Sequence, residues 1–459
     1  VYLDEYVNFL VDRFGMANTS TGIKGYSLDN EPGLWISTHP RIHPVKVRCL
    51  ESVQKTIRVS TAVKNVDPYL EIFGPVLYGF NAYYSFQEAP DWDSVKSGTN
   101  YQWFIDYYLD QMRLAEISAG KRLLDVLDIH WYPEAMGDNR ITQTNANTTA
   151  DKLARIQAPR TLWDNNYTEN SWIGQWFGSY LPLIPRLKSS INEYYPGTKL
   201  AFTEFSYGGE NDITGAIAMA DVLGILGKYD VYLGTYWQLD SPSNYISAAY
   251  KIFRNYDGNN STFGNYSLPS ITSDSVNTSI YGSFDDTKNT IHLIVINKKL
   301  NESVNGNFSI SSQNNIQSGS VWKLDGNSSE ISEINPVTNI TNNSFSYTLP
   351  AGSVCHFVLQ TDAVDVSEEK IFPKNYYLTA YPNPFNPQTK IQYAITHTQF
   401  VTLKVYDVLG NEILTLVDEE KSPGIYEIDF NASKLSSGVY FYSLQAGTFT
   451  ETKKLILIR

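Results

Sequence analysis

The sequence predicts an α/β domain, with its strands in a parallel sheet or barrel, followed by two β-rich domains. From residue 1 to 255, short apolar runs alternate with helical patterns, which is typical of parallel strands joined by crossover helices. From 256 to 360, short β runs lie between Asn, Ser and Gly turns, a pattern typical of a β-sandwich. Residues 361–373 form an acidic segment with little periodicity, which predicts a linker, and residues 374–459 are β-rich again.

Five segments of the first domain have the length and apolar character of buried strands. They are residues 23–29, 70–76, 126–131, 200–205 and 231–237. Helical patterns lie at residues 45–63, 103–117, 183–194 and 213–226, and the chain opens on a further one, VYLDEYVNFLVDRFG. Five strands cannot close an eight-stranded barrel, so we expect about three βα units to be missing ahead of residue 1.

The composition limits the classes of partner. With 42% hydrophobic and 18% charged residues, the chain is typical of a globular protein. Its net charge of −13 argues against nucleic acid, whose phosphates require a basic surface. No apolar run approaches the ~20 residues of a membrane span. The chain has 33 Tyr and 9 Trp, and rings with a polar edge suit surfaces that hold amphipathic ligands such as sugars.

Two glutamates follow strands in a way that predicts a catalytic pair. Asn30-Glu31-Pro32 comes directly after the first strand segment, and Glu204 lies near the end of the fourth. Barrel enzymes build their sites at the C-terminal ends of the strands. A single glutamate at a strand end is usually solvated or ion-paired. Two of them among aromatic loops fit glycoside cleavage, which needs an acid and a carboxylate beside the scissile bond, with their pKa values pushed apart.

The residues around this pair resemble glycoside hydrolase family 44, within the clan of retaining barrel glycosidases. The resemblance rests on four segments, YSLDNEPGLW (26–35), DIHWYPE (128–134), AFTEFSYGG (201–209) and GTYWQLD (234–240), and covers about residues 1–360. It implies that Glu31 is the acid/base and Glu204 the nucleophile, with no catalytic cofactor. It also implies an incomplete (β/α)8, TIM-type barrel joined to a β-sandwich, and internal cleavage of β-1,4-linked glucan, including xyloglucan.

The same resemblance implies a substrate-binding set around the pair. Asn30 would hydrogen-bond the sugar 2-hydroxyl, although an asparagine at a strand end can be only a turn residue. Tyr132 would hydrogen-bond the nucleophile, and Trp237 would form the floor of the sugar pocket. Trp172 and Trp176 share one face if that segment is helical, and are either core residues or stacking platforms. The further candidates are Trp35, His130, Trp131 and Tyr207.

Metal-binding patterns are weak. His39 and His43 have i,i+4 spacing, but Pro40 and Pro44 disrupt the helix that a zinc site on one face would need. We expect no catalytic metal. A structural calcium ion would suit the many Asp and Asn residues, although no EF-type loop is present. The two cysteines, Cys49 and Cys355, are expected to be buried free thiols.

The C-terminal unit resembles a type IX secretion sorting domain, which implies an immunoglobulin-like β-sandwich. The segments are YPNPFNPQTKIQYAI (381–395), VYDVLGNEILTL (405–416) and KLSSGVYFYSLQAGTFTETKKLILIR (434–459). The resemblance implies export through type IX machinery and a secreted or bacterial surface location. An accessory or sugar-binding module is the alternative for this unit.

We therefore expect a secreted, monomeric, retaining endo-β-1,4-glucanase or xyloglucanase that acts by double displacement on β-glucan polysaccharide. Three alternatives remain open at this point. The first is a retaining barrel hydrolase acting on xylan or mannan, and the second a non-catalytic surface glycan-binding protein. A structural adhesin is the third, but it leaves the Asn-Glu-Pro arrangement unexplained.

Overall fold

The computed structural model describes residues 2–239, 241–286, 289–312, 314–362, 376–447 and 449–458. Contacts divide the chain into two compact units, Val1–Ala363 and Val364–Arg459. The predicted linker at 361–373 lies outside the described residues except for its first two, and the first of these still belongs to a strand.

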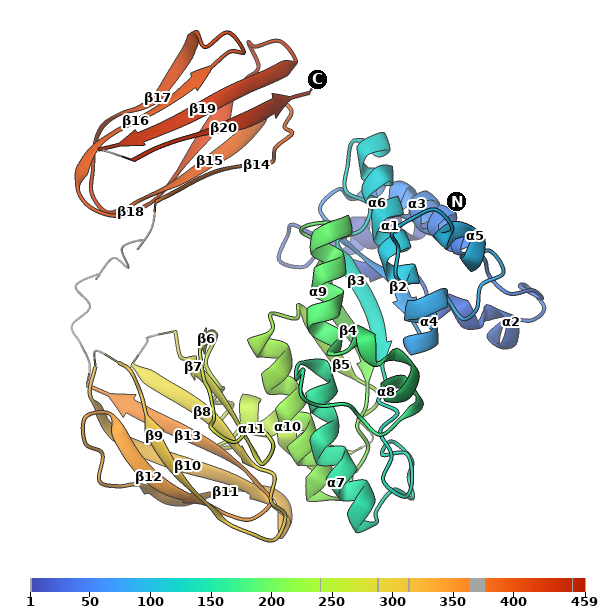
Figure 1. The fold of residues 1–459 in the computed structure, drawn as a ribbon, viewed down its shortest axis with the longest axis vertical. Helices are drawn as coiled ribbons and strands as arrows, with labels where there is room; N and C mark the ends of the chain where they lie inside the picture. Colours follow the sequence, from blue (N-terminus) through green and yellow to red (C-terminus); the bar gives the residue numbers. More distant parts are fainter. Residues whose placement is uncertain are drawn as a thin grey trace. The chain divides into compact units, whose positions relative to one another are not determined.

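The first unit begins with a parallel sheet whose strands lie side by side in chain order (Figure 1). They are β1 (Gly25–Ser27), β2 (Glu71–Leu77), β3 (Val126–Trp131), β4 (Lys199–Phe205) and β5 (Leu233–Tyr236). All four neighbouring pairs are parallel. The five strands predicted from apolar runs are confirmed, with bounds that shift by a few residues, and together with the helices they give a mixed α/β fold.

Helices lie in each connection between these strands. The long ones are α3 (Cys49–Val66), α6 (Phe104–Ala119), α9 (Leu183–Tyr194) and α10 (Ile213–Lys228), which confirm the four predicted helical patterns, and α1 (Tyr2–Phe14) precedes β1. The shorter ones are η1 (Pro32–Leu34), α2 (Trp35–Thr38), α4 (Phe80–Ser85), α5 (Trp92–Lys96), α7 (Thr149–Gln157), η2 (Ala158–Leu162), α8 (Trp172–Phe177), η3 (Gly178–Tyr180) and α11 (Tyr245–Arg254). Many of the short helices follow the C-terminal ends of β1, β2 and β3, so the loops there are long and structured.

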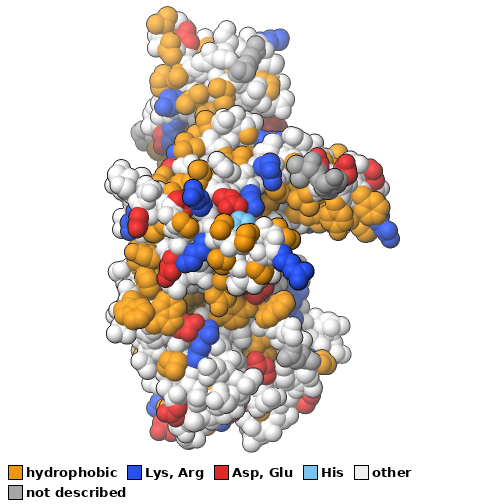
Figure 2. Space-filling model, turned by 90° about the vertical axis from the view of Figure 1, so that its right-hand side faces the viewer, with side chains coloured by type: hydrophobic (Ala, Val, Ile, Leu, Met, Phe, Trp, Pro, Cys, Tyr) orange, Lys and Arg blue, Asp and Glu red, His pale blue; other side chains and the backbone are white. Residues whose placement is uncertain are grey.

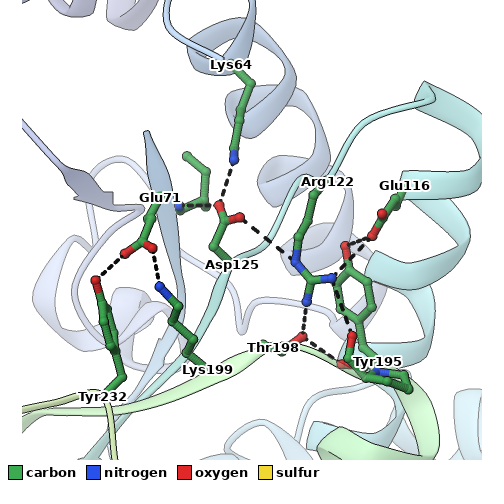
Figure 3. A network of polar contacts seen from close by, with 11 residues as sticks. Lys64, Glu71, Glu116, Arg122, Asp125, Tyr195, Thr198, Lys199 and Tyr232 are labelled. Carbon is green, nitrogen blue, oxygen red and sulfur yellow. Dashed lines mark hydrogen bonds and ion pairs between the residues drawn. The ribbon is translucent and has the colours of Figure 1, made fainter. Parts of the chain in front are cut away.

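A polar network joins the N-terminal ends of the strands (Figure 3). Glu71, at the start of β2, accepts hydrogen bonds from Lys199 of β4 and from the Tyr232 hydroxyl ahead of β5. Asp125, just before β3, pairs with Lys64 of α3 at 2.8 Å. These contacts link four strands and a helix at the edge of the sheet opposite to the predicted site, where polar groups in barrel proteins serve stability.

Two antiparallel sheets complete the first unit. The larger has the order β11-β10-β13-β8-β7-β6 and the smaller pairs β12 with β9. The strands are β6 (Tyr266–Leu268), β7 (Thr278–Phe284), β8 (Thr290–Asn297), β9 (Val304–Ser309), β10 (Ile316–Asp325), β11 (Ser328–Val337), β12 (Ser344–Leu349) and β13 (Ser353–Thr361). Side chains of both sheets share one apolar cluster, in which Phe308 and Phe345 are stacked at 4.9 Å.

The larger antiparallel sheet is buried on both faces. On β8, Ile291, Leu293 and Val295 belong to the cluster between the two antiparallel sheets, whereas Ile294 and Ile296 belong to the core around the parallel sheet and its helices. This explains the nearly continuous apolar run of β8, since a strand covered on both faces needs no polar alternation. The α/β part and the antiparallel sheets therefore share a core. Cys49 and Cys355 are buried free thiols, as predicted.

Buried polar pairs cross this shared core. Lys298 Nζ lies 2.7 Å from Asp221 Oδ2 of α10, and each side chain is 1% exposed. The Tyr281 hydroxyl donates to the other oxygen of Asp221 at 2.6 Å. The ion pair ties α10 to the end of β8, and the Tyr281 hydroxyl ties α10 to β7. Removing one partner of the ion pair would leave an uncompensated buried charge.

Two buried histidines form a second link. The ring of His356 lies with Nδ1 2.8 Å from the carbonyl oxygen of Ile252 in α11 and Nε2 3.0 Å from His292 Nδ1. A carbonyl only accepts, so His356 Nδ1 carries the hydrogen and Nε2 accepts from His292 Nδ1. Burial lowers the pKa of His292 to about 4 and that of His356 to about 3. Both rings are therefore neutral in the folded protein near neutral pH.

The second unit consists of two antiparallel sheets with a core of their own. Their strand orders are β14-β15-β18 and β17-β16-β19-β20. The strands are β14 (Tyr377–Tyr381), β15 (Gln388–Ile395), β16 (Gln399–Tyr406), β17 (Glu412–Lys421), β18 (Gly424–Asn431), β19 (Gly438–Ala446) and β20 (Phe449–Leu457). The β-rich pattern predicted for this region is confirmed.

The distribution of surface charge and the hydropathy of the helices complete the description. On the face drawn in Figure 2, basic side chains are scattered between acidic and uncharged ones. Within the described ranges, no helix combines the length and hydropathy that crossing a bilayer requires.

The histidine pair predicts acid lability of the first unit. An unfolded imidazole binds a proton below its ordinary pKa of 6.5, whereas the folded rings stay neutral down to about pH 4. The unfolded state therefore binds more protons in this window, and stability falls as pH falls. Each ring adds about 1.4 kcal/mol per pH unit to the slope. Urea unfolding between pH 7 and pH 4 measures it.

The double variant His292→Phe/His356→Phe is expected to give a shallower pH dependence than the wild type, because it removes both titrating rings. The exposed His39 supplies the control, since His39→Gln should retain the wild-type slope. Equal slopes for the double variant and the wild type would contradict the assignment.

Candidate active site

Glu31 lies in a strained turn beyond the end of β1. Its backbone is left-handed, with φ 49° and ψ 58°, and its amide donates to the carbonyl of Val76 at 3.1 Å. Val76 also has a positive φ of 60°, which is rare for a β-branched residue. Such conformations cost about 1–3 kcal/mol each and cluster at functional sites. The ends of β1 and β2 thus hold each other in a shape that the chain would not adopt alone.

Glu204 lies near the end of β4, three strands from Glu31. The hydroxyl of Tyr132, which directly follows β3, donates to Glu204 Oε2 at 2.8 Å. Burial and the hydrogen bond to Glu204 raise the pKa of Tyr132 well above its ordinary value. The phenol therefore remains protonated and continues to donate to this carboxylate.

His130 connects the two glutamates. Its side chain is 1% exposed, and Nδ1 lies 2.7 Å from Glu31 Oε1 and 3.4 Å from Glu204 Oε2. The hydroxyl of Tyr83 donates to the His130 carbonyl, which fixes the backbone at this position. Nδ1 and one oxygen of each glutamate all lie within 4.8 Å of one another. Three such atoms could also ligate a divalent cation.

The glutamate pair opens into a cleft of about 570 Å³, within the usual size range of ligand sites. Its walls come from the segments that follow the five strands. The lining residues are Glu31, Tyr78, Gly79, Phe80, Asn81, Gln87, Tyr132, Glu134, Arg140, Thr142, Trp172, Ile173, Glu204, Ser206, Glu210, Trp237 and Gln238. The strand ends that sequence patterns indicated as the site do meet at one cleft.

Tryptophan side chains from two segments of the chain line the cleft. Trp237, just beyond β5, is 56% exposed. Trp172, on α8, is half-buried and lies edge-on to Phe80, with ring centroids 6.5 Å apart. Trp176 shares the helix with Trp172, its ring 6.4 Å away, and is 69% exposed outside the cleft lining. Exposed indole faces of this kind suit flat, partly apolar ligands.

Trp131 and Tyr207 do not offer a face to a ligand. They are 1% and 0% exposed, and the Trp131 indole donates to the Tyr207 hydroxyl at 3.0 Å. The expectation that these two residues contact substrate directly is wrong, because both rings lie in the core. They support the sheet instead.

Asn30 and Trp35 also lie outside the lining of the cleft. Asn30 is exposed beside Glu31, and its amide donates to Asp29 at 2.7 Å. Trp35, on α2, is half-buried, with the Lys55 ammonium group 4.5 Å from the ring centroid. Substrate contact by Asn30 and Trp35 therefore stays a prediction.

Charged lining residues beyond the pair were missed by the sequence patterns. Arg140 lies 2.9 Å from Glu134, and Glu210 accepts from the Tyr236 hydroxyl at 3.0 Å. Glu134 and Glu210 closely follow the ends of β3 and β4, which is the signal that could have identified them. Arg140 carries no such signal, because it lies in an irregular loop.

Comparison with known proteins gives two family matches. Residues 1–135 match glycoside hydrolase family 44, and residues 379–458 match the secretion system C-terminal sorting domain. The chain is 58% identical over 367 residues to endoglucanase A of Paenibacillus lautus, covering 80% of this chain and 52% of that protein. It is 48% identical over 366 residues to β-mannanase/endoglucanase A of Caldicellulosiruptor saccharolyticus, covering 76% of this chain and 27% of that protein.

A solved relative adds structural agreement. The family 44 xyloglucanase of Paenibacillus polymyxa superposes with a TM-score of 0.76 at 56% identity, covering 78% of this chain and 70% of that one. The chain spans about half of the Paenibacillus lautus relative and about a quarter of the Caldicellulosiruptor one.

Proposed function

The chain belongs to glycoside hydrolase family 44, and on this premise we propose that it cleaves internal β-1,4-glucosidic bonds of cellulose-type glucans or xyloglucan with retention. One observation carries the proposal: an oxygen of Glu31 lies within 4.8 Å of an oxygen of Glu204 in an open cleft. Retaining enzymes hold the two carboxyl groups about 5–5.5 Å apart, whereas inverting enzymes leave about 6.5–9.5 Å for a water molecule.

The proposed reaction is a double displacement. Glu204 attacks the anomeric carbon while Glu31 protonates the departing glycosidic oxygen, which leaves a covalent glycosyl-enzyme. Glu31 then takes a proton from water, and that water releases the sugar from Glu204. Tyr132 keeps the attacking carboxylate oriented through its 2.8 Å hydrogen bond. His130, buried between the two glutamates, holds their relative position.

Substrate binding is proposed to rely on the aromatic walls. The sugar rings of a β-1,4-glucan carry equatorial hydroxyls around flat apolar faces, and these faces can stack on Trp172 and Trp237. Trp176 would extend the stacking surface beyond the cleft. Asn30, next to Glu31, is proposed to reach the 2-hydroxyl of the sugar.

The finer architecture is proposed on the same basis. The five parallel strands in chain order, with helices in each connection, are proposed to form an incomplete (β/α)8 barrel. The antiparallel sheets of the first unit would form a β-sandwich, and those of the second an immunoglobulin-like one.

The C-terminal sorting domain marks the chain for type IX secretion to the cell surface or the extracellular space. The secretion machinery is accordingly a proposed partner.

Replacing either glutamate by glutamine tests the assignment. Glu31→Gln and Glu204→Gln in the full chain should each lower kcat on xyloglucan by about 10²-fold or more, since each removes a group that reacts in the transition state. Release of reducing ends gives the rate. The exposed Glu302 provides the control, because Glu302→Gln should retain wild-type turnover.

Activated substrates separate the two roles. An aryl cellobioside whose phenol leaves without protonation should restore the first step in Glu31→Gln but not in Glu204→Gln. Wild-type turnover of xyloglucan by either variant would defeat the assignment.

The stereochemical outcome is a separate prediction. The first product should carry the β configuration at its new reducing end, because two displacements restore the original geometry. Proton NMR during the first minutes of hydrolysis, before mutarotation, distinguishes the anomers. An initial α-anomer would contradict the double displacement.

A polysaccharide panel tests the substrate class. Xyloglucan and carboxymethylcellulose should release reducing ends faster than xylan or mannan, because xylose lacks the hydroxymethyl group and mannose has an axial 2-hydroxyl. Glu204→Gln supplies the background rate. Faster release from mannan or xylan would favour the alternative hydrolases, and binding without release would favour a non-catalytic glycan-binding protein.

A further inference from the structure

One buried carboxylate lies beneath the site and takes no part in the proposed chemistry. The side chain of Asp128, on β3, is 0% exposed. Its oxygens accept hydrogen bonds from the hydroxyl of Thr203 on β4 and, at 3.4 Å, from the hydroxyl of Ser27 on β1. Burying an ionisable carboxyl group carries a large desolvation penalty unless hydrogen bonds compensate it. We therefore expect the hydrogen bonds of Asp128 to have a structural role that an apolar residue could not fill.

The two hydroxyls belong to β1, which leads to Glu31, and to β4, which carries Glu204. Ser27 is the last residue of β1, four residues before Glu31, and Thr203 directly precedes Glu204. β1 and β3 are not neighbours, since β2 lies between them, so backbone hydrogen bonds cannot join them. Asp128 thus forms a direct side-chain link from β3 to β1 and another to β4.

β3 and the residue directly after it also carry hydrogen-bond partners of both glutamates. His130 and Tyr132 follow Asp128 at intervals of two residues, the spacing of side chains on one face of a strand. His130 contacts both glutamates, and Tyr132 donates to Glu204. Asp128 therefore occupies the same face one step further from the cleft.

Thr203 occupies an irregularity of β4. In the pairing with β3, Phe202 lies opposite Ile129 and Glu204 lies opposite His130, so Thr203 is an extra residue. A bulge of this kind changes the direction of the next side chain and is frequent beside active sites. Here it lets two consecutive residues, Thr203 and Glu204, both contact the face of β3 that carries Asp128 and His130. In a regular strand they would point to opposite faces.

We propose that Asp128 is a positioning residue, which holds the β4 bulge through Thr203 and the end of β1 through Ser27 and so sets where Glu204 and Glu31 lie. This inference rests on the proposed function and deepens it. Asp128 is fully buried and does not line the cleft, and its side chain bonds to Thr203 and Ser27, so its effect is on the alignment of the reacting groups. A displacement of about 1 Å in such a site can lower the rate about 10²-fold.

The hydroxyl of Thr203 offers the sharpest test. Thr203→Val keeps the shape and the β-branch but removes the donor, whereas Thr203→Ser keeps the donor. In the full chain, Thr203→Val should lower kcat on xyloglucan at least tenfold, with KM and the Kd of a xyloglucan oligosaccharide within about twofold of wild type, because the tryptophan walls that bind sugar are untouched. Thr203→Ser should recover kcat to within about threefold. Asp128→Ala should behave like Thr203→Val.

A matched control removes a buried hydroxyl that donates to a different aspartate. Ser190 donates to Asp106 at 2.6 Å, and neither residue lines the cleft. Ser190→Ala should lower the Tm without changing kcat or KM. If Asp128→Ala does not fold, the Thr203 pair decides the question, because it differs by one hydroxyl.

The outcomes separate this inference from the proposed function. Turnover by the wild type and none by Glu204→Gln would support the proposed function. The Thr203 variants would then test only the positioning role of Asp128. Wild-type kcat in Thr203→Val, or equal changes in kcat and KM, would overturn the positioning role. A wild type that releases no reducing ends overturns both proposals.

Discussion

The site depends on one imidazole that lies between two carboxylates. His130 is buried, and its Nδ1 atom contacts an oxygen of Glu31 and approaches one of Glu204. Two partly buried carboxylates at this distance repel each other unless donors lie between or beside them. His130, on β3, and Tyr132, directly after it, supply such donors, so this segment acts as the common support for two glutamates that lie 173 positions apart in the chain.

The surrounding fold keeps β3 in place. The strand is buried over its whole length, the polar network at the opposite edge ties its start to α3, and Asp128 links its middle to β1 and β4. Further out, the larger antiparallel sheet shares the core that surrounds the helices. Because protein interiors are packed as densely as crystals, a displacement in one layer is transmitted to the next. The cleft therefore relies on packing well beyond its lining residues.

The character of the cleft follows from its location. Parallel strands deliver all their C-terminal ends to one edge, and the loops after β2, β3, β4 and β5 add aromatic faces and a small number of charges. Glu134, Arg140 and Glu210 give this wall hydrogen-bonding groups suited to a neutral, hydroxyl-rich ligand. The second compact unit has its own core and a separate role in secretion.

The sequence by itself determined the elements and the strand ends, because periodicity and apolar runs are local properties. Glu31 and Glu204 could be predicted for the same reason, because each lies at or just beyond the end of a strand. His130 and Tyr132 were predicted through the family resemblance of residues 128–134. The tertiary structure alone decided which side chains meet. Trp131 and Tyr207 proved to be core, since no local pattern says what covers a ring. The bulge at Thr203 shifts the alternation of β4 by one residue, so the face on which Glu204 lies could not be read from a period of two.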